Sequence, residues 1–106
     1  MRNSNTNSIG DAWSQAEIYA VWKKAQIITG GYDPSKTRKD ICNALIDYDK
    51  HGKQVSRGWE IDHIKPVSKG GSDDIQNLQP LQWENNQKKA DDYPADNFCA
   101  VSRRLM

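Results

Sequence analysis

The chain has 106 residues, which is enough for one small domain with a modest core. Its 15 basic and 14 acidic residues give a net charge of +1, so a nucleic-acid partner would have to be held by locally placed lysine and arginine side chains. No apolar run reaches membrane-spanning length, and no membrane partner is expected. Cys42 and Cys99 are too few for a disulfide framework and form no C-x-x-C pair, which favours a reduced, cytoplasmic protein.

The N-terminal residues have no apolar pattern. The opening MRNSNTNSIG lacks the charged start and apolar centre of a signal peptide. We therefore predict a disordered lead-in over residues 1–12, followed by a single domain over residues 13–106.

An amphipathic helix is predicted directly after this lead-in. Ser14 and Glu17 have the spacing of a capping box, and Trp13 precedes them at a staple position. The helix then carries an apolar stripe formed by Ile18, Val21, Trp22 and Ala25. The turn-forming residues between Gly30 and Pro34 are expected to end the helix.

The middle of the chain allows two interpretations. Residues 39–48 have apolar positions that suit a helix, but Leu45 to Tyr48 equally suit a strand. We favour a strand that pairs with residues 59–64 in a long hairpin.

Two further strands and a helix are predicted downstream. Residues 59–64 alternate in the manner of a strand, which Pro66 should end because proline cannot donate a ladder hydrogen bond. Residues 70–73 are turn formers, residues 78–82 form a second short strand, and residues 83–92 form a polar helix.

The most informative residues stand at the ends of these elements. Asp62 and His63 close the first strand, Asn77 precedes the second, and Asn86 and Lys89 lie on the helix. This order of D-H-I-x-P, a G-G loop, N-L-x-x-L and N-x-x-K resembles the HNH endonucleases over about residues 57–92. The family's third histidine is replaced by Asn86, and the upstream stretch is similar to small stand-alone bacterial and phage members.

The resemblance implies a fold and a set of roles. The fold would be α+β, with a ββα-metal core and an added N-terminal amphipathic helix. His63 would be the general base, Asp62 and Asn86 the metal ligands, and Asn77 the residue that pins the loop and so holds the histidine. Outside the motif, His63 would be interpreted as a core histidine and Asn86 as a solvated helix residue. Adjacent strand residues point to opposite faces, so Asp62 and His63 can share one site only where the strand kinks or ends.

The ligand types indicate the metal. Aspartate and asparagine offer oxygen atoms, which suit one Mg²⁺ or Mn²⁺ ion. Many family members also hold a structural zinc with two C-x-x-C pairs. The second pair would fall at Gln82 and Asn85, so no structural zinc is expected.

Basic side chains near the motif are candidates for phosphate contacts. The nucleic-acid-binding candidates are Arg57, Lys65, Lys69, Lys88 and Lys89, with Arg38 and Lys39 as possible additions. Acidic neighbours partly cancel their charge, which predicts weak and salt-sensitive binding.

The leading hypothesis is a metal-dependent endonuclease that cuts DNA and leaves 5′-phosphate and 3′-hydroxyl ends. One alternative is a nucleic-acid-binding module on the same scaffold without turnover. Another is a nuclease toxin domain, whose partner would be an immunity protein. A lone domain of this size could also work within a larger protein machine. A bacterial or phage-infected cytoplasm is the expected location.

Overall fold

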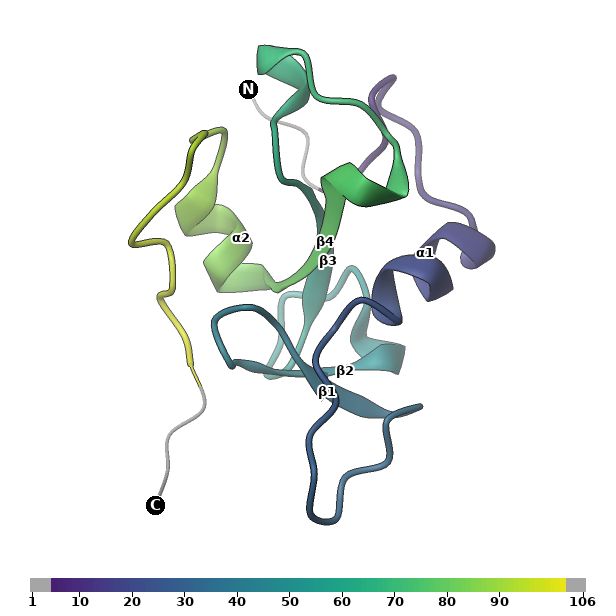
Figure 1. Ribbon diagram of the computed structural model, residues 1–106. Helices are drawn as coiled ribbons and strands as arrows, with labels where there is room; N and C mark the ends of the chain where they lie inside the picture. The colour runs from purple at the N-terminus through teal and green to yellow at the C-terminus, as the bar shows by residue number, and fades with distance from the viewer. Residues whose placement is uncertain (1–4, 103–106) are drawn as a thin grey trace.

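The computed structural model describes residues 5–102, which form two α-helices, three single-turn 3-10 helices and two small antiparallel sheets (Figure 1). In chain order the elements are α1 (Gln15–Trp22), β1 (Thr37–Lys39), β2 (Leu45–Asp47), β3 (Trp59–His63), β4 (Leu78–Gln82) and α2 (Trp83–Lys89). This mixture is of the α+β class, as predicted. Within residues 5–102, no helix combines the length and apolar character needed to cross a membrane.

The antiparallel pair of β3 and β4 lies at the centre of the molecule, with α1 and α2 on opposite sides of it (Figure 1). Trp59 pairs with Gln82 at one end and His63 with Leu78 at the other. Because strand side chains alternate, Ile61 faces the apolar core, while its neighbours contact α2. The core consists of Trp13, Ile18, Val21, Trp22, Ala25, Ile46, Trp59, Ile61 and Leu78.

Helix α1 begins as predicted but ends early. Ser14 Oγ accepts from the Glu17 amide at 3.1 Å, and the Glu17 carboxylate accepts from the Ser14 amide at 2.9 Å, which completes the capping box. The helix ends at Trp22 rather than near Gly30. The reason is that Gln26 exchanges two backbone hydrogen bonds with Lys39, which draws the chain into an extended path beside β1.

The predicted strand near residue 45 is present, but its predicted partner is wrong. β2 pairs with β1 and not with residues 59–64. Two features favour this short hairpin: Asn43 adopts a left-handed conformation with φ 65°, and the Asp40 carboxylate accepts from the amides of Cys42 and Ala44 within the turn.

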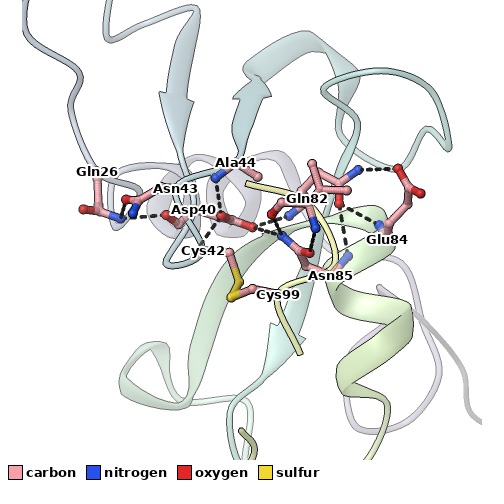
Figure 2. The surroundings of a disulfide bond; sticks show 10 residues. Gln26, Asp40, Cys42, Asn43, Ala44, Gln82, Glu84, Asn85 and Cys99 are labelled. Atoms are coloured by element: carbon pink, nitrogen blue, oxygen red, sulfur yellow. Dashed lines mark hydrogen bonds between the residues drawn. A yellow bond between two sulfur atoms is a disulfide. The ribbon is translucent and has the colours of Figure 1, made fainter. Parts of the chain in front are cut away.

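The Asp40 carboxylate also connects this hairpin to α2 (Figure 2). It is 1% exposed, and it accepts from the Gln82 amide at 2.9 Å and from Asn85 Nδ2 at 3.0 Å. With the two bonds inside the turn, four donors satisfy this buried charge. The start of α2 is therefore fixed to the β1–β2 turn.

The prediction of reduced cysteines is wrong, because Cys42 and Cys99 form a disulfide (Figure 2). The C-terminal segment folds back beside α2, where Val101 and the Asn85 side chain exchange two hydrogen bonds. This return path brings two cysteines that are 57 positions apart to a Cα separation of 5.4 Å. The predicted cytoplasmic location rested on reduced cysteines and loses that support.

The prediction of a disordered lead-in does not hold for residues 5–12, while residues 1–4 lie outside the described residues. Asn5 Oδ1 accepts from the Ile61 amide at 2.8 Å, and Ser8 binds the Asp73 carboxylate. The N-terminal segment is thus attached both to β3 and to the loop that follows it.

Candidate active site

His63 is the last residue of β3, and its ring is fixed by two contacts. The imidazole packs on the Trp13 indole with 5.6 Å between ring centroids, and its Nε2 lies 2.8 Å from Asp73 Oδ1. Only 12% of the side chain is exposed. The predicted general base is therefore held at the edge of the core, on the α1 side of the sheet.

The carboxylate of Asp73 is itself anchored by Ser8. The Ser8 amide lies 3.0 and 3.1 Å from its two oxygens, and Ser8 Oγ donates to Oδ2 at 2.8 Å. Partial burial opposes ionisation, but the hydrogen bonds from His63 and Ser8 prevail and lower the pKa of Asp73. The imidazole therefore faces an ionised carboxylate at neutral pH.

Asn77 braces the loop between β3 and β4. Its Oδ1 accepts from the Lys65 amide at 2.9 Å, and its Nδ2 donates to the carbonyls of Lys65 and Ser72 at 3.0 and 2.8 Å. Gly71 is needed for this close approach, since a Cβ there would lie 1.7 Å from the Lys65 carbonyl oxygen. Asn77 thus holds the loop that follows His63, which is the role that the resemblance to the HNH endonucleases implies for it.

Asp62 points to the opposite side of the sheet from His63, towards α2. Its carboxylate accepts from Gln79 Nε2 at 3.0 Å and lies 3.1 Å from the Lys89 ammonium. Lys89 also donates to the carbonyl of His63 at 3.0 Å, which ties α2 to the end of β3. Both members of the Asp62–Lys89 pair are buried, with side chains 2% exposed.

Asn86 lies on the same side of the sheet and is fully buried. Its Nδ2 donates to Glu60 Oε1 at 2.9 Å. Glu60 stands two residues before Asp62, so both carboxylates project from β3 towards α2. The β3–α2 contact is therefore a polar layer of carboxylates, an amide and an ammonium group.

Asp62 and His63 border one cleft, although they leave the strand on opposite sides. The cleft has a volume of about 400 Å³ and is also lined by residues 5–10, by Pro66 to Ser68, and by Ala90 and Asp91. The strand ends at His63, and this ending allows two successive side chains to reach the same space. Asn86 is not among the lining residues and lies deeper, against Glu60.

The donor atoms fit a hard cation. Asp62 and Asn86 supply oxygen, and no cluster of three or more His, Cys, Asp or Glu side chains occurs within residues 5–102. A cation bound by Asp62 and Asn86 would have a carboxylate oxygen and an amide oxygen as its protein ligands, and this donor set suits Mg²⁺ or Mn²⁺. The Lys89 ammonium stands at the same carboxylate, so Lys89 and a cation would compete for Asp62.

The basic residues predicted to bind nucleic acid differ in their exposure and in their contacts. Lys65, Lys69 and Lys88 are exposed. Lys89 is buried in its ion pair and cannot contact a phosphate at the surface, which corrects its assignment to the binding group. Arg57 precedes β3, at the end opposite His63, and lies 3.7 Å from Asp47. Arg38 donates to three backbone carbonyls and has a structural role.

Sequence reasoning missed several residues of the site. Glu60 could have been found, because it shares the period-two face of Asp62. Gln79 could have followed from the strand register, in which it pairs with Asp62. Ser8 carries no such signal, since its contact with Asp73 spans 65 positions.

Residues 47–92 match the family model described as HNH endonuclease. The matched segment contains β3, β4 and α2 and all the candidate catalytic and metal-binding residues. Residues 47–92 are therefore similar to the HNH endonucleases, a family of nucleases, and the resemblance recognised from the motif is confirmed over this segment. Comparisons with curated proteins and with solved structures gave no significant match.

Proposed function

We propose that the protein is a metal-dependent endonuclease that hydrolyses DNA phosphodiester bonds in the cleft at the end of β3. The observation that carries this proposal is that a carboxylate and an imidazole, Asp62 and His63, line one cleft inside the HNH segment. The β3–β4–α2 succession would then be the ββα-metal core, with α1 bracing its other side.

His63 would act as the general base. Its imidazole would take a proton from a water molecule that attacks phosphorus in line with the leaving 3′ oxygen, which gives 5′-phosphate and 3′-hydroxyl ends. Trp13 and Asp73 hold the ring in place during this transfer, and Asn77 holds the loop that follows.

Asp62 and Asn86 would hold one divalent cation, Mg²⁺ or Mn²⁺. Stabilisation of the developing negative charge on the phosphate is the chemistry that such a cation supplies when bound. When the cation binds, Lys89 would release the Asp62 carboxylate. Its hydrogen bond to the His63 carbonyl would keep the ammonium near the site.

DNA is the proposed partner. Lys65 and Lys69 follow His63 directly in the chain and are exposed, and Lys88 is exposed on α2. These three exposed lysines lie close in the chain to residues that line the cleft, and they would be the ones to contact phosphates. With a net charge of +1, the binding would be weak and would decrease steeply with salt.

The test is a plasmid-nicking assay with Mg²⁺ or Mn²⁺. The parent should nick supercoiled DNA, whereas H63A and D62A should lose at least about 100-fold in rate. H51Q is the matched control, because His51 lies near the opposite end of β3 and glutamine can still donate to Asn5. A parent that is inactive with either metal, or an H63A variant as active as the parent, would overturn the proposal.

A second candidate is a nucleic-acid-binding module without turnover. The buried Lys89–Asp62 pair favours it, because the carboxylate is neutralised without a metal. Saturable DNA binding that leaves the backbone intact in Mg²⁺ would identify this function.

A further inference from the structure

We propose that Asp73, held in place by Ser8, is the residue that positions His63 and makes Nδ1 the proton-accepting nitrogen of its ring. This inference rests on the proposed function, since it assigns the atom that does the chemistry. Asp73 belongs to the loop between β3 and β4, touches no reacting group, and acts only through the histidine.

The first argument is geometric. The His63 ring is fixed by Trp13 on its face and by Asp73 at Nε2, at 2.8 Å. Without the carboxylate, the Trp13 contact alone would allow the ring to flip by half a turn about its Cβ–Cγ bond, which exchanges the positions of its nitrogen and carbon atoms. A positioned base needs both its place and its ring orientation, and Asp73 supplies the second.

The second argument is chemical. A neutral imidazole has one N–H donor and one bare nitrogen, and a carboxylate can only accept. Asp73 Oδ1 therefore requires the proton on Nε2, and the lone pair is left on Nδ1. When Nδ1 takes a proton from water, the same carboxylate stabilises the resulting positive ring.

The third argument concerns what holds Asp73. Its side chain is 33% exposed and belongs to an irregular loop, so it would be mobile without support. Ser8 supplies three contacts to its two oxygens, of 2.8 to 3.1 Å. The N-terminal segment thereby becomes part of the positioning apparatus, through a chain of contacts from Ser8 to Asp73 to His63.

The first test is nuclear magnetic resonance of the imidazole nitrogens at about pH 8, where an ordinary imidazole is neutral. The chain has only two histidines, and H51Q leaves His63 as the single signal. We expect the proton on Nε2, in slow exchange, in the parent background. In D73A the slow exchange should be lost. In D74A it should remain, because Asp74 is an exposed neighbour in the same loop. A proton on Nδ1 in the parent background, or an unchanged signal in D73A, would overturn the proposal.

The second test is nicking kinetics with the same matched pair. D73A should lower kcat by at least about tenfold and change KM for DNA by less than about twofold, while D74A should retain the parent kcat. The kcat of S8A should lie between those of D73A and D74A, because the backbone amide of residue 8 still donates to the Asp73 carboxylate. A higher kcat in D73A would mean that the carboxylate blocks the base, and equal rates in D73A and D74A would mean that it does nothing. Either result overturns the positioning role while the proposed nuclease activity stands. An inactive parent overturns the proposed function, and the resonance experiment still decides whether Asp73 sets the tautomer.

Discussion

The Lys89 ammonium lies 3.1 Å from an Asp62 carboxylate oxygen, and both side chains are almost completely buried. Such a pair satisfies each charge but contributes little net stability, because both ions lost their hydration on burial. Its larger consequence concerns the metal, since a divalent cation would have to replace the ammonium at the same carboxylate.

Lys89→Met should therefore separate stability from metal binding. The variant leaves the Asp62 charge buried without its ammonium partner, which should lower the free energy of unfolding by about 3 kcal/mol in the absence of metal. Mg²⁺ should then raise its melting temperature more than it raises that of the parent, because no ammonium competes.

Lys88→Met is the control for this experiment. Lys88 is the exposed neighbour on α2, so its loss should change stability by less than about 0.5 kcal/mol. Thermal unfolding with and without Mg²⁺ measures both effects. A Lys89→Met variant as stable as the parent in metal-free buffer would contradict the account of the pair.

Asn77→Ala should loosen the loop that follows His63. Three side-chain hydrogen bonds to backbone groups are lost, and we expect about 2 kcal/mol less stability together with reduced nicking. Gln76→Ala is the matched control, because that side chain is exposed and is the preceding residue. Urea unfolding of the two variants gives the comparison, and equal midpoints would show that Asn77 does not brace the loop.

The local elements of the nuclease segment could be predicted from the sequence because their signals are short-range. The alternation over residues 59–64 and the run over residues 78–82 predict β3 and β4 to within a residue. The capping box likewise marks the start of α1. Each signal lies within a few residues of the element that it specifies.

The features that were missed are of two kinds. The Cys42–Cys99 disulfide depends on the return of the C-terminal segment along α2 and has no local signal. The pairing of β2 with β1 does have one, because the Asp40 side chain binds the amides two and four positions later and Asn43 is left-handed. The site shows the same division, since the motif indicates His63 but not the carboxylate ten positions later that holds its ring.

Reduction of the disulfide should destabilise the fold. The bond closes a loop spanning 57 positions, for which the chain-entropy estimate is about 4 kcal/mol. Cys99 is exposed, so a reductant has access to the bond. Denaturant unfolding should show a lower midpoint for the parent in reducing buffer. The double variant C42S/C99S should unfold at a similarly low midpoint that does not respond to reductant. A parent midpoint that is insensitive to reductant would contradict this expectation.

The stability of the protein should fall in mild acid because of His51. Burial against Trp59 lowers the pKa of this imidazole below its ordinary value of about 6.5. His51 therefore binds a proton more readily in the unfolded chain than in the folded protein. Its contribution to the free energy of unfolding is complete above about pH 6.5 and is lost as the pH falls below that value.

H51Q isolates this contribution, since it removes the titrating ring and leaves His63 unchanged. Urea unfolding at several pH values between about 5 and 7.5 should show a smaller loss of stability for H51Q than for the parent. Parallel profiles for the two proteins would show that His51 is not responsible.

The attachment of Asn5 to β3 and of Ser8 to Asp73 has a practical consequence for how the protein is prepared. A shortened fragment that starts at Trp13, where the sequence predicts that the domain begins, would discard both anchors and one wall of the cleft. A fragment of this kind that fails to nick DNA would fail because its N-terminal residues are missing. Nicking assays should therefore use the chain without truncation and place any purification tag at the C-terminus.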